Sequence, residues 1–369
     1  MNRRRFLQAS AAATLAGVAG CGGAATNPTG RFAGRSLRVF VYAGGHEATM
    51  RATFVPHFEA LTGASVTLYP GWWDGMQKLK AAPAGDPPFD LMITDATQGY
   101  PAAKEGRFAQ LDWANVPNKA ALAPAATDHW VTTAGHGLTY PDAVMTLAYR
   151  HDAAPTPPAR WGDLLRPEFA GKLGLYNHFY LSLYTFACVL ADQDGNKLPA
   201  RTVLETRTDE VFKLARDTRT GVKLWWPNTT DMILALVNRE VAAGNMHSPE
   251  YLQALKEKPA LAAVVPATDR AFVQVFWAVP AGSPNRDIAE AAINELFSHE
   301  VQLAVARRGS ATARPDTAAQ MAAEDPRWAE LYPHTPDQFR TLAYYPYDWY
   351  AGRWEALADR WDRTVLRGG

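Results

Sequence analysis

Short apolar runs alternate with segments of helical periodicity along the first third of the folded chain. The runs predict strands at 37–42, 64–69 and 89–94, and the segments between them predict helices at 47–61 and 73–82. Strands that alternate with helices in this way predict a parallel sheet covered by helices. The apolar side chains of the first helix recur every three or four residues, at Met50, Phe54, Phe58 and Leu61.

The alternation continues in the rest of the chain. Further strands are predicted at 144–149, 172–176, 222–226 and 273–279, and further helices at 179–191, 208–219, 229–239, 288–297 and 301–306. A chain of 369 residues is longer than one compact hydrophobic core usually spans, so we expect two lobes.

The carboxyl ends of the first three strands form a candidate binding edge, because ligands of open α/β sheets bind beyond that edge. The loops after Tyr42, Tyr69 and Thr94 lie there. Gly44 and Gly45 open the helix after the first strand, and free backbone N–H groups at a helix start can hold an anion. The alternative is that the two glycines only allow a tight turn.

The first thirty residues have the order of an export signal. Residues 2–8, Asn-Arg-Arg-Arg-Phe-Leu-Gln, resemble a twin-arginine motif, with departures at the first and last positions. The apolar stretch 9–19 is shorter than the ~20 residues of a membrane-spanning helix. Cys21 follows Val-Ala-Gly, which resembles a bacterial lipobox, so we expect a signal peptide over 1–20 and a lipidated Cys21. The alternative is an incidental cysteine in a loosely apolar terminus.

Charge and cysteine content narrow the possible functions. The chain has 37 basic and 37 acidic residues, and three of the basic ones lie in the signal. No basic stripe remains, so nucleic-acid binding is not indicated. With Cys21 lipidated, Cys188 has no partner for an intrachain disulfide, and its apolar helical surroundings predict a core thiol.

Several stretches resemble, in order, the periplasmic solute-binding proteins of ABC importers, in the branch that includes spermidine/putrescine-binding proteins. The stretch 161–173, Trp-Gly-Asp-Leu-Leu-Arg-Pro-Glu-Phe-Ala-Gly-Lys-Leu, is the most similar to a family motif. The resemblance implies a type II-like α/β fold with two lobes, two parallel-rich sheets flanked by helices, and a cleft that closes by a hinge motion. The other similar stretches are 54–66, 89–91, 104–112, 240–244 and 276–285.

The resemblance also implies a division of the chain into lobes and a set of binding partners. We expect a flexible tether over 21–35, a first lobe from 36–140 and 278–313, and a second lobe from 141–277 and 314–369. The implied partners are a small-molecule ligand, an ABC permease with its ATPase, and the membrane, reached through the lipid anchor. The protein would act as a monomer in the periplasm or on the extracytoplasmic face.

Polyamine binders of this family pair ammonium groups with acidic residues and cover the methylene groups with aromatic rings, as a buried cation requires. Carried over one position at a time, most of the acidic positions fall on other residue types here. The expected solute is a polyamine or another amine-containing compound, and two aromatic rings with one carboxylate suit a monovalent organic cation or a molecule with an amine and an acid. The histidines and the glycine-opened helix suit a small carboxylate or phosphonate. The candidate ligand-binding residues are Gly44, Gly45, His46, Trp72, Asp95, His178, Trp226, Asn228 and His247.

Each candidate also has a structural alternative. Asp95 is equally suited to cap the next helix, and buried histidines are often hydrogen-bonded structural residues. Trp72 and Trp73 are adjacent and diverge on a helix, so only one of them is expected to face the cleft.

No cofactor, metal or catalytic residue is predicted. The histidines show no metal-ligand spacing, and the chain lacks a Gly-x-Ser-x-Gly nucleophile element, so a secreted hydrolase is the less favoured alternative. A secreted sensor or partner-binding protein on the same fold is another alternative, since fold alone does not determine function. The function that we expect is capture of a small organic solute and its delivery to an ABC permease.

Overall fold

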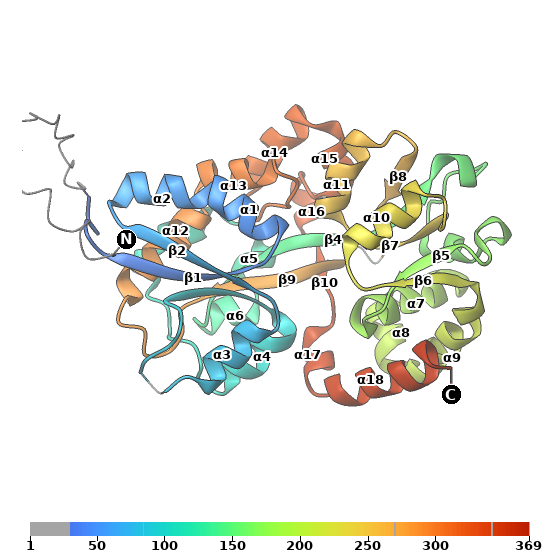
Figure 1. The fold of residues 1–369 in the computed structure, drawn as a ribbon, viewed down its shortest axis with the longest axis horizontal. Helices are drawn as coiled ribbons and strands as arrows, with labels where there is room; N and C mark the ends of the chain where they lie inside the picture. Colours follow the sequence, from blue (N-terminus) through green and yellow to red (C-terminus); the bar gives the residue numbers. More distant parts are fainter. Residues whose placement is uncertain (1–29, 84, 269–270, 341, 369) are drawn as a thin grey trace, which may run out of the picture.

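The computed structural model describes residues 30–83, 85–268, 271–340 and 342–368. Two α/β lobes lie side by side and are joined in the middle by strands that run from one lobe to the other (Figure 1). The predicted two-lobed α/β fold is confirmed.

The first lobe is built on three parallel strands, β1 (Ser36–Tyr42), β2 (Ser65–Gly71) and β3 (Leu91–Asp95), in the order β2-β1-β3. Phe40 of β1 lies opposite Tyr69 of β2 and opposite Met92 of β3. The carboxyl ends of all three strands therefore meet at one edge of the sheet. The surrounding helices are α3 (Asp74–Ala81), α4 (Ala96–Lys104), α12 (Arg286–Leu296) and α13 (His299–Ala306), with the helical region 45–62.

The helix predicted at 47–61 is two helices, α1 (Gly45–Ala52) and α2 (Phe54–Thr62). Pro56 accounts for the break, because proline has no N–H to donate to the carbonyl of Ala52 and its ring clashes with that carbonyl. The backbone turns at Thr53, whose hydroxyl donates a hydrogen bond to the carbonyl of Thr49 at 2.7 Å.

The second lobe is built on β5 (Leu173–Tyr176), which is parallel to β6 (Val222–Trp226) and to β7 (Ala243–His247). Almost every side chain of α7 (Phe179–Gln193) is buried, including that of Cys188, which confirms the predicted core cysteine. The other helices here are α8 (Ala200–Thr206), α9 (Thr208–Thr218), α10 (Thr229–Val237), α11 (Ser248–Glu257) and α18 (Trp354–Trp361).

Three strands connect the lobes, and we call them the hinge strands: β4 (Leu138–Arg150), β9 (Ala271–Ala278) and β10 (Ala343–Tyr344). β4 pairs with β9, and then with β7 and β8 (Leu261–Val264) of the second lobe, all antiparallel. The described strands therefore form one ten-stranded sheet of mixed direction, in which eight strands follow the order β2-β1-β3-β9-β4-β7-β5-β6, β10 pairs with β9 and β8 pairs with β4. The two predicted sheets are joined through β4.

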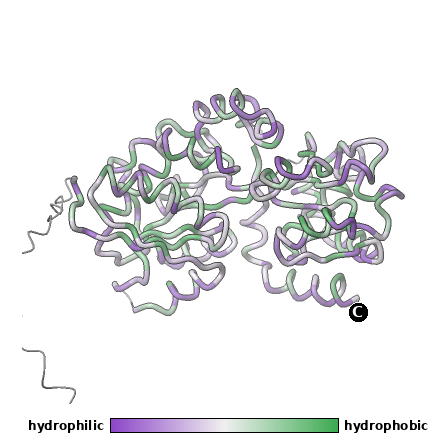
Figure 2. Tube along the Cα trace, turned by 45° about the horizontal axis from the view of Figure 1, so that its top comes forward, coloured by the Kyte–Doolittle hydropathy of each residue, from purple (hydrophilic) through white to green (hydrophobic). Residues whose placement is uncertain are grey.

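Each lobe has its own apolar core, and a third cluster covers the hinge. The first core draws on residues within 32–138 and 275–313, and the second mainly on 145–271 and 345–365. Figure 2 shows the apolar stretches running through the interior of both lobes. The third cluster packs against Val144 and Phe272 of the hinge strands. It is built largely from α14 (Pro315–Glu324), α15 (Pro326–Leu331) and α16 (Pro336–Arg340).

Residues 31–35, at the end of the predicted tether, pack on the first lobe. Phe32 is 3% exposed and belongs to the first core, and its N–H donates to the carbonyl of Thr62 at 2.9 Å. The guanidinium groups of Arg31 and Arg35 lie 4.9 and 5.4 Å from the centre of its ring. Arg35 also forms a two-pronged ion pair with Asp287. The chain therefore joins the first lobe firmly from Phe32 onward.

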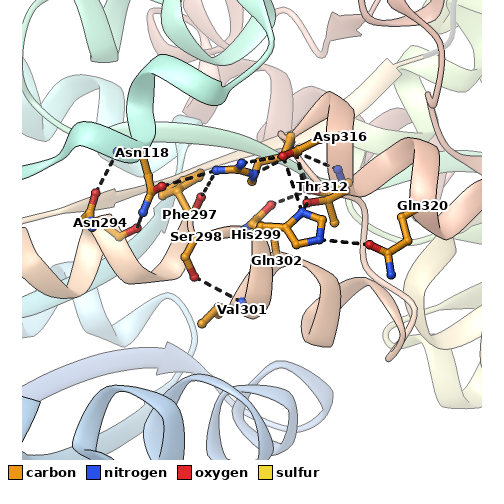
Figure 3. Close-up of polar contacts among 12 residues, drawn as sticks. Asn118, Asn294, Phe297, Ser298, His299, Val301, Gln302, Thr312, Asp316 and Gln320 are labelled. Atoms are coloured by element: carbon orange, nitrogen blue, oxygen red, sulfur yellow. Dashed lines mark hydrogen bonds and ion pairs between the residues drawn. The ribbon is translucent and has the colours of Figure 1, made fainter. Parts of the chain in front are cut away.

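Arg314 holds the start of α14 against the first lobe. Its side chain donates twice to Asp316, at 2.9 and 2.6 Å, and once to the backbone carbonyl of Phe297 at 3.2 Å. Its backbone N–H donates to the Thr312 hydroxyl, which in turn donates to Gln302. Figure 3 shows Phe297, Thr312 and Asp316 drawn together from separate segments by these contacts.

We expect Arg314→Ala to lower the free energy of unfolding by about 1–3 kcal/mol, because it leaves the buried carbonyl of Phe297 without its charged donor. Urea unfolding followed by circular dichroism measures the change. Arg363→Ala is the matched control, since Arg363 pairs with Asp359 on the exposed surface, with both side chains more than 60% exposed. That variant should lose less than about 0.5 kcal/mol. Equal losses in the two variants would contradict the assigned role of Arg314.

Candidate functional site

Asp95 stands at the carboxyl end of β3 and caps α4. Its carboxylate oxygen Oδ1 accepts hydrogen bonds from the backbone N–H of Thr97 at 2.7 Å and of Gln98 at 3.2 Å, and from the Thr97 hydroxyl. The predicted structural alternative, a helix cap, is thus part of its role. Only Oδ1 is used, and among the described residues no Lys, Arg or His forms an ion pair with this carboxylate.

Burial raises the pKa of Asp95 above its ordinary value, and the hydrogen bonds from Thr97 and Gln98 only partly offset this. A buried carboxylate without a counter-charge is costly, because its hydration is lost and nothing replaces the lost attraction. A cation placed beside Oδ2 would remove that cost.

Six rings of the second lobe gather near the carboxyl ends of β5, β6 and β7. Tyr176 lies 4.4 Å from Trp226 between ring centres, and Tyr180 stacks on His247 at 6.3 Å. We call this set the ring cluster: Tyr176, His178, Tyr180, Trp226, His247 and Trp354.

The first lobe meets the ring cluster through Trp73 and Asp95. The ring of Trp73 stacks on His178 with centres 5.8 Å apart and lies 6.0 Å from Trp354. Burial raises the pKa of Tyr176, and the charge of Asp95 raises it further, so the carboxylate of the first lobe acts electrostatically on the ring cluster. We call the region between Trp73, Asp95 and the ring cluster the lobe junction.

His46 lies in the first turn of α1, just beyond the carboxyl end of β1, which is the strand beside β3. Its ring lies 5.7 Å from that of Tyr42 and 6.0 Å from that of Trp277. Both ring nitrogens are buried and have no hydrogen-bond partner among the described residues. Burial lowers the pKa of His46 to about 4, so the ring is neutral at ordinary pH.

Unpartnered polar atoms concentrate around these rings. Buried polar atoms in proteins almost always have a partner, so each exception points to a missing group. Tyr345, whose hydroxyl is one of them, packs against Tyr180 of the ring cluster. The other atoms of this kind in the described structure near these rings are His178 Nδ1, Trp226 Nε1, His247 Nε2 and both ring nitrogens of His46.

The remaining predicted residues lie farther out. Trp72 is 56% exposed and stacks on Tyr42 at 5.4 Å, so of the adjacent tryptophans it is Trp73 that contacts the second lobe. Asn228 is exposed and caps α10 by accepting from the N–H of Asp231 at 3.0 Å. Gly44 and Gly45 are exposed at the start of α1.

Sequence reasoning missed Tyr176, Tyr180 and Trp354. Tyr176 ends a predicted strand, and Tyr180 begins the predicted helix after it, so the strand-end rule that selected Asp95 would have found both. Trp354 lies in the tail that was assigned to the second lobe, but no pattern there indicated that α18 brings a ring to the strand ends.

Two other hollows lie away from the lobe junction, on the first lobe. One, of about 530 Å³, is lined by residues of α2 and by Glu300, and the other, of about 450 Å³, lies beside α12. Neither contains the unpartnered atoms described above. Within the described ranges, no three His, Cys, Asp or Glu side chains are placed to hold a metal ion. None of the helices in the described part of the chain has the length and apolar character of a membrane span.

Comparison with protein families gives a match over residues 53–332, about three-quarters of the chain, to the model of the bacterial extracellular solute-binding proteins. The chain belongs to this family. No curated protein matches its sequence. As a bacterial extracellular solute-binding protein, it binds a solute outside the cytoplasm.

Solved structures share the fold at low sequence identity. An ABC transporter substrate-binding protein from Bradyrhizobium japonicum USDA 110 has a TM-score of 0.74 at 18% identity, over 90% of this chain and 99% of that one. A GABA receptor has a TM-score of 0.72 at 18% identity, over 89% and 96%. A spermidine/putrescine-binding protein from Streptococcus pneumoniae strain Canada MDR_19A has a TM-score of 0.70 at 17% identity, over 90% and 99%.

The stability of this solute-binding protein should fall as the pH drops from about 6.5 to about 4. Burial lowers the pKa of His46 and of His247 to about 4. Between about pH 6.5 and pH 4 these histidines are protonated in the unfolded chain but not in the folded one, so the free energy of unfolding decreases as the pH falls. Asp95 has the opposite effect: because its pKa is raised in the folded form, its protonation increases the free energy of unfolding as the pH falls.

Melting temperatures at pH 7 and pH 4.5 measure this loss. The double variant His46→Gln/His247→Gln should lose less on acidification than the unsubstituted protein. His151→Gln, at an exposed position, is the control and should leave the profile unchanged. An unchanged profile in the double variant would show that these two histidines do not cause the acid sensitivity.

Proposed function

We propose that this chain is a lipid-anchored solute-binding protein that captures a small organic solute carrying an amine and delivers it to an ABC permease. The observation that carries the proposal is Asp95, a partly buried carboxylate with no ion-pair partner among the described residues, whose charge acts on the hydroxyl groups of Tyr176 and Tyr180. A carboxylate beside aromatic faces is the pairing that binds an ammonium group when water is excluded.

The rings explain how affinity would arise without many charges. Trp73 and Trp354 cover His178 from two lobes, so a solute between them would lose most of its contact with water. Apolar and aromatic walls with a few polar groups are typical of small-molecule sites. Two proteins of the same fold are named for GABA and for spermidine/putrescine, which are amines, and this supports the same class of ligand.

The hinge strands supply the motion that such capture needs. β4 and β9 run between the lobes, so a small rotation about them would separate Trp73 from His178 and expose the lobe junction. The solute would bind while the lobes are apart, and its contacts with both would hold them together for delivery.

An amine that binds here should raise the melting temperature of the protein. Full-length protein in detergent would be heated with putrescine, spermidine, 4-aminobutyrate or betaine, and ligand at 100 times its dissociation constant adds about 2.7 kcal/mol. Asp95→Asn should remove the shift, because the amide keeps the shape of the cap but carries no charge. Asp231→Asn, on the exposed face of α10, should retain it. A full shift in Asp95→Asn, or none with any amine, would rule the amine site out.

The lipid anchor has a separate test. Cys21 lies outside the described residues, and its role rests on the lipobox-like sequence before it. Cys21→Ser should move the protein from the membrane pellet to the soluble fraction, because the acyl chains that hold it are lost. Cys188→Ser, at the buried thiol, should stay in the pellet. Retention of Cys21→Ser on membranes would contradict lipidation.

A further inference from the structure

The sheet edge that carries Asp95 also carries the start of α1. Gly44 stands before the helix with φ 88° and provides no side-chain cap. In the described structure the backbone N–H groups of Gly45, His46 and Glu47 donate no hydrogen bond. Unused N–H groups and the positive end of the helix dipole both favour a negative charge at this place.

The ring of His46 is a second and independent sign of a missing group here. Both of its nitrogens are buried without a partner, although a neutral imidazole offers one donor and one acceptor. Tyr42 and Trp277 pack against the imidazole ring of His46. These aromatic contacts do not replace the hydrogen bonds that the two ring nitrogens lose when they are buried. A polar ligand group at the start of α1 would satisfy the donor.

The two places are close together because their strands are neighbours. β1 and β3 are parallel and hydrogen-bonded, with Phe40 opposite Met92, and each strand ends two or three residues later. Neighbouring strands lie about 4.8 Å apart, so the ends of β1 and β3 are close together, and α1 starts three residues after β1 ends. With carbon–carbon bonds of ~1.5 Å, a chain of a few methylene groups is long enough to join a group beside Asp95 to one at the start of α1.

We propose that the ligand of the lobe junction is a small amino-carboxylate. Its ammonium group lies between Asp95 and the ring cluster, and its carboxylate lies at the start of α1 beside His46. The inference rests on the amine-binding function above and adds a second charged group to the same ligand.

A diamine fits this arrangement less well. Its second ammonium group would face the positive helix end, with no free carboxylate to pair with there. The acidic side chain of α1 itself, Glu47, is already paired with Arg51 at 2.6 Å. The lobe junction should therefore distinguish two ligands of equal length by the charge at one end.

Four compounds with four-atom chains test this directly: 4-aminobutyrate, putrescine, butylamine and butyrate. Calorimetric titration of full-length protein in detergent should show 4-aminobutyrate binding at least tenfold more tightly than each of the others. Asp95→Asn should weaken 4-aminobutyrate and butylamine by about 10–100-fold and leave butyrate unchanged. His46→Phe should weaken 4-aminobutyrate and butyrate and leave butylamine unchanged, with His151→Phe as an exposed control.

The outcomes separate this inference from the function on which it rests. Putrescine binding as tightly as 4-aminobutyrate would overturn the inference and leave the amine site standing. Binding of butyrate alone, unaffected by Asp95→Asn, would overturn the amine site. Binding of none of the four would overturn both. If His46→Phe does not fold, His46→Asn keeps a polar side chain of smaller size and replaces it.

Discussion

The continuous strand β4 is the constraint on which the rest of the molecule depends. Its first half is hydrogen-bonded to β9 beside the first-lobe sheet, and its second half to β7 and β8 of the second lobe. A register shift between Pro141 and Val144 interrupts the pairing with β9, and the pairing with β7 begins directly afterwards at Met145. Because the two sheets share this backbone, the edges that carry Asp95 and the ring cluster face each other rather than lie at random.

The electrostatics of the lobe junction follow from that arrangement. Many aromatic rings and few charges are brought together, so the histidines lose water and stay neutral, and the one carboxylate is harder to ionise. A site of this kind stabilises the separate protein poorly. The proposed ligand would supply partners for the unpartnered atoms, which is the property that a capture protein needs.

Sequence reasoning found the elements that depend on local pattern. The strands that end at Tyr42 and Trp226 lie where the apolar runs predicted them, and α7 follows the apolar helical pattern that surrounds Cys188. The predicted helix 47–61 was wrong only at Thr53, where Pro56 acts on a carbonyl four residues earlier.

What the sequence could not predict depends on contacts between distant segments. The antiparallel pairing of β9 with β3 and β4 joins residues more than a hundred positions apart, and nothing local to either strand signals it. Trp354 reaches the ring cluster because the chain descends between the lobes through α17 (Tyr347–Ala351) and continues as α18 beneath the second lobe (Figure 1). Asp95 was found because it ends a strand, whereas its lack of a counter-charge became visible only in three dimensions.

Because Phe32 packs in the first-lobe core, a lipid anchor at Cys21 would attach the first lobe to the bilayer. Nine residues separate Gly30 from Cys21, and nine residues span at most about 30 Å when fully extended. An acylated Cys21 would thus keep the first lobe within about one bilayer thickness of the surface. The second lobe is joined only through the hinge strands, so opening and closing would be its movement, while the first lobe stays at a nearly constant height above the lipid.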